Sequence, residues 1–472
     1  MTDPDISTPA RVSWRWGSTG VLGGTGVLLG LAVGELAREP QPLGAAFMAI
    51  CVVAAGAVFV RVLGWNVGLA VLLVVTCLID RNTFAVGRLN TRPEHVAAAV
   101  ALLVFVISRI RAGRSLLVRP DRAEAALLAW FAIALLSSVL VAPNRADSLK
   151  VLALLLVSSL ALFLPRRLLA GRRSEVEQVV GWTLIALAVE SGYAYLAYLL
   201  HLFGPTISAG FNSATGHLDA YGTLWEPNVL GAFAGAGAVA WAYLGPRLFK
   251  HSWIGVAVCL SACAASWARA AWLAVFVVFL ITLVGPTRRQ IDLKAFFAGA
   301  AGAAVLVLGI LAADAFGSYT LAGGNIGSSV GNGADLLGRL YQISPALSDL
   351  KHQPIIGRGV DSFGQLHVLQ GMPEHLTNLE LAIAHDTGAL GLIAFAAFVV
   401  FVIMAAWRAR ANLTVLGLAA TILVIAITNQ ATETLELMVM WLVIGLLMVA
   451  LDAAQDPATS PEIVRTAPRS GS

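Results

Sequence analysis

The chain has 472 residues, of which 58% are hydrophobic and only 12% are charged, and its formal net charge is +4. Soluble domains carry about 25% charged residues, so this chain has too few charges to cover a water-exposed surface. The composition excludes a soluble cytosolic enzyme, a disordered scaffold and a secreted disulfide-bonded protein. The basic residues are spread along the chain, which argues against a surface for nucleic acid.

Apolar segments long enough to span a bilayer recur along the whole chain. We therefore predict an all-α fold, a polytopic transmembrane helical bundle of about 12–14 spans with short helices in a long outer-face loop. The 4 cysteines lie in apolar runs without metal-ligand spacing. No cleaved targeting peptide is expected at the N-terminus. The candidate spans are 17–34, 43–60, 65–79, 95–110, 123–141, 148–164, 176–202, 227–245, 252–268, 270–285, 295–313, 388–406, 412–428 and 434–451.

The basic residues predict the orientation of these spans, because cytoplasmic loops carry an excess of Lys and Arg. With the N-terminus inside, about two thirds of the 31 basic residues fall on the cytoplasmic side. The chain is then expected in the inner (plasma) membrane with both termini in the cytoplasm. The expected divisions are a cytoplasmic tail (1–16), a bundle of about eleven spans (17–313), a large periplasmic loop (314–387), three further spans (388–451) and a second cytoplasmic tail (452–472).

Two of the expected outer loops have unusual compositions. All but one of the 8 histidines fall at or beyond the outer boundary, and the loop 203–226 has no Lys or Arg. The loop 314–387 is much longer than the other connections, and loops beyond about 15 residues are usually functional or disordered. Its residues 334–350 have the apolar spacing of a helix. Titratable chemistry is therefore expected on the outer face.

Three outer arginines are candidate anion ligands, because a guanidinium group forms paired hydrogen bonds with phosphate oxygens. Arg269 lies between two apolar spans with almost no loop, where an unpaired charge is costly. Arg339 belongs to the helical stretch of the long loop, and Arg358 lies between two glycines that let the backbone bend sharply. The alternatives are an interfacial arginine that snorkels to water for Arg269 and solvated arginines for the other two.

A second set of candidates lies just before the span 388–406 and comprises His375, Asn378, His385 and Asp386. A histidine here could take a proton from a hydroxyl group while a carboxylate orients its ring. The alternative for either histidine is a solvated loop residue.

Glu226 and Asn228 flank Pro227 at the start of the span 227–245. A proline suits the first turn of a helix, and an acidic side chain is favoured at its positive end. Both residues are possible supports of an outer site, and the alternative is helix-start chemistry alone.

Together these segments resemble the O-antigen ligase and O-antigen polymerase superfamily of bacterial membrane glycosyltransferases over roughly residues 220–400. Where that family has a histidine directly before the asparagine, this chain has Thr377, so the sequence leaves open whether His375 or His385 is the base. The matching elements are Glu226-Pro227-Asn228, Ser266 to Trp272 around Arg269, Arg339 followed by Pro354 to Gly359, and Asn378 to Gly391.

The resemblance implies a GT-C-like bundle and a metal-independent, inverting transfer without a cofactor. The donor would be a glycan on a polyprenyl (undecaprenyl-type) diphosphate, and the acceptor a hydroxyl or amine on a glycan, lipid or protein. The implied partners therefore include membrane lipids but no nucleic acid. The resemblance assigns Arg269, Arg339 and Arg358 to the diphosphate. It assigns His375, Asn378, His385 and Asp386 to catalysis, with Glu226 and Asn228 in support. Ligase and polymerase remain alternatives because they differ in the acceptor.

A transporter of solutes or lipid-linked glycans is an alternative from another class. It predicts ionisable residues buried within spans and two symmetric halves. Glu190 lies within the span 176–202 and is such a residue, although a packing role is equally compatible with its position. The eleven spans before the long loop and three after it argue against symmetric halves.

Overall fold

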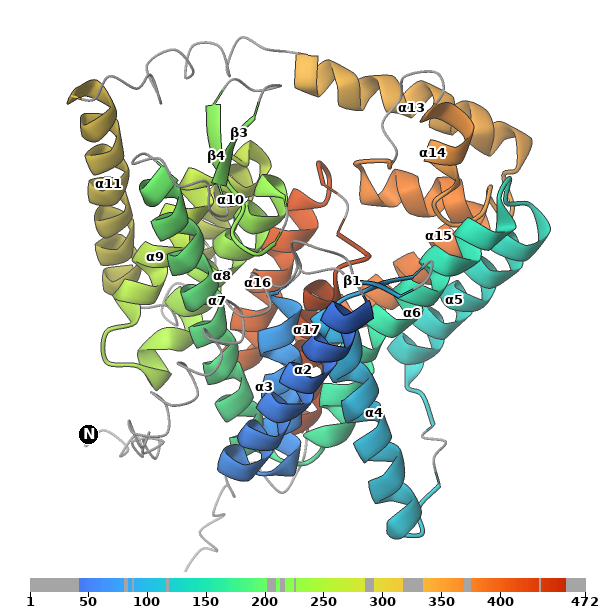
Figure 1. Cartoon of the computed structure of the whole chain (residues 1–472), viewed down its shortest axis with the longest axis horizontal. Coiled ribbons are helices and arrows are strands. Elements are labelled where there is room, and N and C mark those ends of the chain that lie inside the picture. Colours follow the sequence, from blue (N-terminus) through green and yellow to red (C-terminus); the bar gives the residue numbers. More distant parts are fainter. Residues whose placement is uncertain are drawn as a thin grey trace, which may run out of the picture.

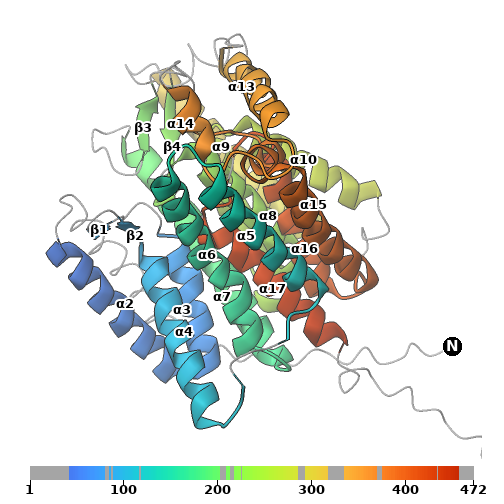
Figure 2. The same cartoon turned by 90° about the vertical axis from the view of Figure 1, so that its right-hand side faces the viewer.

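A computed structural model describes residues 42–79, 84–86, 89–115, 119–201, 209–212, 217–224, 226–284, 293–316, 334–368, 375–432 and 434–455. These residues form a bundle of packed helices (Figures 1 and 2). The helices are α2 (Pro42–Leu63), α3 (Trp65–Cys77), α4 (Pro93–Arg111), α5 (Arg122–Leu140), α6 (Arg145–Leu168), α7 (Arg173–His201), α8 (Pro227–Leu248), α9 (Ser252–Ala265), α10 (Arg269–Val284), α11 (Leu293–Phe316), α13 (Ala334–His352), α14 (Ser362–His367), α15 (Leu379–Arg408), α16 (Leu413–Thr428) and α17 (Met438–Gln455).

The prediction of an all-α, multi-pass membrane bundle is confirmed. Eight of the described helices are long and apolar enough to cross a membrane: α2, α4, α5, α6, α7, α8, α15 and α17. Shorter apolar helices, namely α3, α9, α10, α16 and the first part of α11, fall on other predicted spans. The predicted span 17–34 and the tail 1–16 lie outside the described residues.

Two short antiparallel hairpins, which the sequence did not predict, lie between helices. Strand β1 (Phe84–Val86) pairs with β2 (Leu89–Thr91), and β3 (Ala209–Asn212) pairs with β4 (His217–Ala220). The β3–β4 hairpin lies at the same end of the bundle as α13 and α14, whereas α4 ends at the opposite end (Figure 1).

Helix α8 forms the centre of the bundle, and 94% of its apolar stretch of 18 residues is buried. Small residues let neighbouring backbones approach it closely, as is common in membrane helices. A Cβ added at Gly231 would lie 2.3 Å from Ala268 Cβ, and one at Gly235 would lie 2.8 Å from a methyl group of Val275. Helix α8 therefore supports the turn that joins α9 to α10.

Helix α15 begins at Leu379, ahead of the predicted span boundary at 388, because Asn378 caps it by accepting a hydrogen bond from the Leu381 amide. The helix is broken at Gly388, whose backbone angles are φ 64° and ψ −166°. That conformation is essentially restricted to glycine. The predicted span thus corresponds to the part of α15 after the break.

The segment after α13 packs directly into this break. The amides of Ala389 and Leu390 donate to the carbonyls of Pro354 (2.9 Å) and Ile355 (3.1 Å). A Cβ at Gly388 would lie 2.4 Å from the carbonyl carbon of Ile355, so no larger side chain fits there. The break in α15 therefore fixes the position of the segment that carries several candidate residues.

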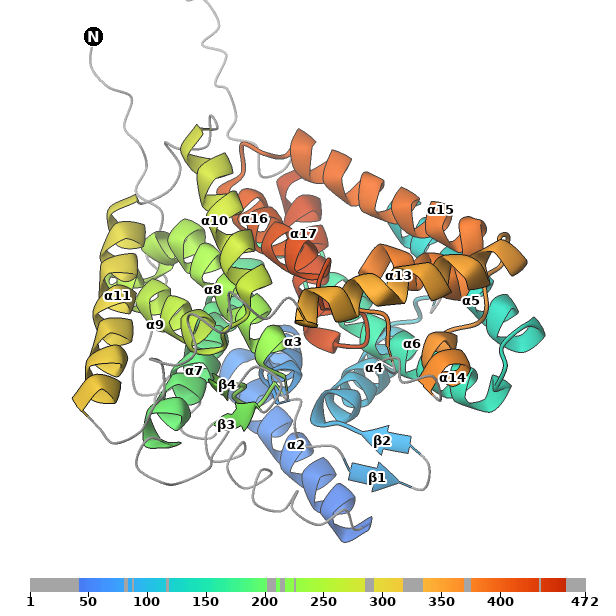
Figure 3. The ribbon, with the colours of Figure 1, turned by 90° about the horizontal axis from the view of Figure 1, so that it is seen from above.

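Helix α13, predicted over 334–350, lies across one end of the bundle (Figure 3). Gln342 and Ala346 are buried, and Asp349 lies on the same face of the helix. Leu340 and Leu347 are 51% and 45% exposed. The polar face of α13 is thus directed toward the candidate site, and part of its apolar stripe is turned away from the bundle.

Candidate functional site

Backbone hydrogen bonds bring three of the predicted residues together at the break in α15. The amide of Arg358 donates to the carbonyl of His385 (2.8 Å), and the amide of Gly359 donates to the carbonyl of Asp386 (2.9 Å). The Ser137 hydroxyl of α5 donates to the same Asp386 carbonyl (2.7 Å). Residues far apart in the sequence are therefore held in one place by the main chain.

The His385 side chain is fully buried between two carboxylates. Its Nδ1 lies 3.0 Å from Asp386 Oδ1, and its Nε2 lies 3.2 Å from Asp349 Oδ2. An ionised carboxylate only accepts hydrogen bonds, so both contacts are satisfied together when the ring is protonated on both nitrogens. Both ring nitrogens of His385 are thus occupied by contacts with protein carboxylates.

Asp349 is shared by two histidines, because His367 Nε2 lies 2.7 Å from the same Oδ2 atom that faces His385. Burial raises the pKa of Asp349, but the hydrogen bonds and charges of His367 and His385 outweigh it and hold that pKa below its ordinary value. Asp349 is therefore a carboxylate at neutral pH. In the part of the chain that the structure describes, no group of three or more His, Cys, Asp or Glu is arranged to hold a metal ion.

His375 forms a second carboxylate–histidine pair and, unlike His385, is exposed. Its Nδ1 lies 2.8 Å from Asp361 Oδ1, and its side chain is 59% exposed. Asp361 has a left-handed backbone conformation (φ 55°), and its amide donates to Asp386 Oδ2 (2.9 Å). A carboxylate at Nδ1 fixes the proton there and makes Nε2 the basic nitrogen. This is the arrangement that a general base requires.

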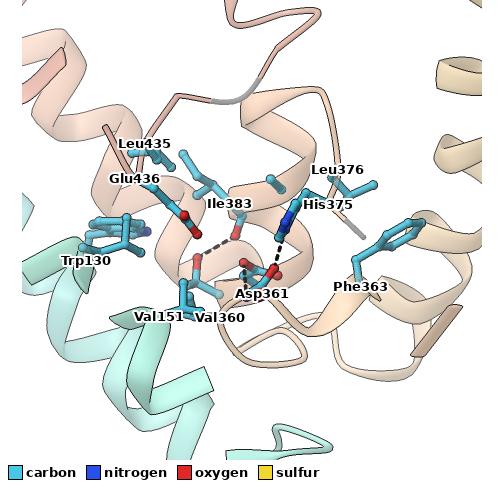
Figure 4. Close-up of a pocket in the computed structure, with 14 residues that line it drawn as sticks. Trp130, Val151, Val360, Asp361, Phe363, His375, Leu376, Ile383, Leu435 and Glu436 are labelled. Carbon is cyan, nitrogen blue, oxygen red and sulfur yellow. Dashed lines mark hydrogen bonds and ion pairs between the residues drawn. The ribbon is translucent and has the colours of Figure 1, made fainter. Parts of the chain in front are cut away.

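The His375–Asp361 pair lines a narrow pocket of about 50 Å³ between α5, α6 and α15. Asp386 and Glu436 also line it, and Trp130 of α5 forms part of its apolar wall. Figure 4 shows the carboxylates of Asp361 and Glu436 directed toward the same space, with the His375 ring beside them. A water molecule needs roughly 10–15 Å³ of such space, so the pocket admits a small polar group rather than a whole ligand.

Arg358 lies beside this cluster and retains hydrogen-bonding capacity. Its Nη2 is 3.9 Å from Asp349 Oδ1, which is too long for a hydrogen bond. Its Nε is buried and has no hydrogen-bond partner among the described residues. A buried guanidinium N–H without a partner is costly, and an anionic ligand would satisfy it.

Arg339 and Asn378 both form hydrogen bonds with the turn after α16. Arg339 Nη1 donates to the carbonyl of Ala431 (2.7 Å). The Asn378 side-chain amide donates to Gln430 Oε1 (3.0 Å), and Gln430 in turn donates to Glu380 (2.8 Å). Asn378 therefore combines helix capping with anchoring of this turn.

Arg269 begins α10 and is exposed, directly after a strained turn. Trp267 in that turn has φ 55°, and the Trp272 ring N–H donates to the carbonyl of Cys263 (2.8 Å), as does the Ser266 hydroxyl (2.8 Å). The turn thus places the Arg269 backbone at a fixed position on the α8–α10 side of the bundle, away from α14 and α15 (Figures 1 and 3).

Glu226 and Asn228 also belong to the α8 side. Pro227 is the first residue of α8, as predicted, and Glu226 is the residue before it but makes no side-chain capping bond. Instead, the Asn228 side-chain amide donates to Glu226 Oε1 (2.8 Å). The two residues stabilise each other at the start of the helix.

The sequence prediction of the site omitted three residues of the cluster: Asp349, His367 and Asp361. Asp349 lies ten residues after Arg339 in α13, a spacing that places both on nearly one helix face. That spacing could have identified Asp349 once the helix was predicted. No local pattern pairs Asp361 with His375, because the pairing depends on a backbone turn fixed from α15.

Comparison with protein-family models gives no match for this chain, and comparison with curated proteins gives none either. The resemblance to the O-antigen ligase and polymerase superfamily therefore stays a prediction based on sequence motifs. The geometry of the carboxylate–histidine cluster is the independent basis for a functional proposal.

Proposed function

We propose that this chain is a GT-C-like membrane glycosyltransferase of the O-antigen ligase or polymerase type, acting on the outer face of the plasma membrane. It transfers a glycan from a polyprenyl diphosphate to a hydroxyl or amine acceptor. The observation that carries the proposal is the pair formed by Asp361 Oδ1 and His375 Nδ1, 2.8 Å apart beside a pocket. A half-exposed histidine oriented by a carboxylate is suited to remove a proton from an acceptor.

In the proposed reaction, His375 Nε2 takes the proton from the acceptor hydroxyl as its oxygen attacks the anomeric carbon. The bond between that carbon and the diphosphate oxygen breaks, and the polyprenyl diphosphate leaves with the electron pair. Asp361 stabilises the imidazolium that forms, as carboxylates do in other histidine-based sites. Attack from the face opposite the leaving group inverts the anomeric centre.

Arginine side chains would bind the diphosphate and stabilise the negative charge that develops on it. Arg358 is the best placed for this role, because it lies next to the Asp349–His385 cluster and has a buried N–H without a partner among the described residues. Arg339 of α13 is proposed as a further ligand. Arg269, at the start of α10, is proposed to contact the donor from the α8–α10 side of the bundle.

The geometry around Glu190 weakens the main argument for a transporter. Glu190 Oε1 accepts the Thr223 amide (2.6 Å), and Oε2 accepts the Thr223 hydroxyl (2.9 Å). That hydroxyl also contacts the carbonyl of Leu78. Both carboxylate oxygens are thus engaged in holding the segment before α8, which is a packing role.

Replacing Arg358 by glutamine is expected to lower glycan transfer about 100-fold or more, because one donor to the developing charge is lost. The rate is measured in proteoliposomes that contain a polyprenyl-diphosphate oligosaccharide and an acceptor. Arg145→Gln is the matched control, since Arg145 is an exposed arginine at the start of α6 and is expected to be dispensable. Full activity in glutamine variants of Arg358, Arg339 and Arg269 alike would refute the assignment.

The same assay separates the related activities. Extension of the donor glycan without a second acceptor identifies a polymerase, and transfer to an added acceptor identifies a ligase. Movement of the donor across the bilayer without any covalent product would identify a transporter and contradict the proposal.

A further inference from the structure

A second cavity lies at the end of the bundle opposite the His375 pocket. It has a volume of about 380 Å³ and lies among the start of α5 and the ends of α6, α15 and α17. Figure 2 shows these four helix ends close together. Phe401, Met404, Met448 and Leu451 contribute to its apolar wall.

The two carboxylates that line this cavity, Asp121 and Asp452, belong to an ion-pair network. Arg166 binds Asp121 Oδ2 (2.6 Å) and forms a two-point contact with Asp452 (2.7 and 2.8 Å). Arg166 and Arg167 also bind Glu124 (3.0 and 2.6 Å). These contacts link the start of α5 to the ends of α6 and α17, and they leave the carboxylates largely neutralised.

Two other arginines line the same cavity, Arg122 at the start of α5 and Arg408 at the end of α15. Both are exposed, and neither forms an ion pair within the described part of the chain. Together with the network of Arg166, they give the cavity one net positive charge. The cavity thus combines two available guanidinium groups with an apolar wall.

The position of the cavity along α15 corresponds to the membrane–water interface. Trp407 is 67% exposed, and the Arg410 guanidinium lies 4.8 Å from the centre of its ring. Exposed tryptophans are enriched at the level of lipid headgroups. Only 11% of the apolar stretch of 18 residues in α15 is buried, so most of this part of the helix faces lipid. A ligand entering between α15 and α17 would come from the bilayer.

We propose that this cavity binds an anionic phospholipid, with its phosphate between Arg122 and Arg408 and an acyl chain against Phe401 and Met404. Charge and shape both favour this occupant. The arginines match a phosphate group, basic pockets between membrane helices bind anionic headgroups, and the apolar wall matches a hydrocarbon chain. The inference does not depend on the proposed transferase activity.

The test compares phosphatidylglycerol with phosphatidylcholine, which has the same acyl chains but no net charge. Native mass spectrometry of the full chain in detergent is expected to show preferential binding of phosphatidylglycerol. The Arg122→Gln/Arg408→Gln double variant is expected to lose at least tenfold in affinity. The matched control is Arg111→Gln/Arg114→Gln, which removes two exposed arginines outside the cavity and is expected to keep wild-type affinity.

Two further measurements identify the source of the phosphate. Ala405→Phe places a larger side chain in the apolar part of the cavity and keeps both arginines. It is expected to weaken phosphatidylglycerol binding. Inorganic phosphate alone is expected not to raise the thermal unfolding midpoint, whereas phosphatidylglycerol is expected to raise it. The proposal is overturned if the double variant binds phosphatidylglycerol as tightly as the wild type. It is also overturned if phosphatidylcholine binds equally well, or if inorganic phosphate gives the full shift.

Discussion

Replacing His375 by glutamine is expected to lower glycan transfer by about 10²–10⁴-fold, the usual contribution of a general base. Glutamine keeps the polar contact with Asp361 but cannot accept a proton at neutral pH. Because the His375 side chain is 59% exposed, the substitution is expected to leave the folded structure intact. The initial rate in proteoliposomes and the thermal unfolding midpoint measure the two effects separately.

Two control variants distinguish the base from the other histidines. His352→Gln changes an exposed histidine at the end of α13 that contacts the Ser348 carbonyl, and its expected effect on transfer is small. His385→Gln removes a buried ring between Asp349 and Asp386 and is expected to lower stability together with activity. A His375→Gln variant that keeps the wild-type rate would exclude His375 as the base.

Replacing Gly388 by alanine is expected to destabilise the fold by about 3 kcal/mol or more. The added Cβ would lie 2.4 Å from the carbonyl carbon of Ile355 and 2.6 Å from the amide nitrogen of Gly357. Both atoms belong to backbone that cannot yield without losing the hydrogen bonds to α15. Chemical unfolding in detergent micelles measures the change in the free energy of unfolding.

Gly113→Ala provides a control for the cost of placing an alanine at a positive φ angle. Gly113 has φ 63°, nearly the same as the 64° of Gly388, but no atom of the described residues lies within 4 Å of its added Cβ. Its expected cost is therefore only the backbone strain of an alanine with positive φ, about 1 kcal/mol. Equal costs at the two positions would show that the packing of the 354–357 segment against α15 does not stabilise the protein.

The helices were predictable because a bilayer imposes long apolar segments, and the described helices follow the predicted spans closely. Helix α13 was predictable from its amphipathic spacing, and the start of α8 from Pro227. The early start of α15 was not predictable, because its first turns contain His385 and Asp386 and have the composition of a polar loop. The break at Gly388 depends on a segment that packs from more than 20 residues earlier in the chain.

The candidate site was predictable only in part. Histidine paired with carboxylate was expected before the span 388–406, and His375 does form such a pair. Its partner Asp361 is 14 residues away in the sequence and is positioned by a left-handed turn that no local pattern indicates. The sequence predicted a supporting role for Asn378 in catalysis but did not predict its two observed contacts, the cap of α15 and the hydrogen bond to Gln430.

The central claim is that His375, oriented by Asp361, activates an acceptor for direct displacement of a polyprenyl diphosphate. Its most direct test is to incubate the purified protein with a polyprenyl-diphosphate oligosaccharide and an acceptor, and to determine the products by mass spectrometry and NMR. The expected result is a new glycosidic bond of inverted anomeric configuration, with one free polyprenyl diphosphate released per bond. Retention of configuration, or donor movement without a covalent product, would contradict the account.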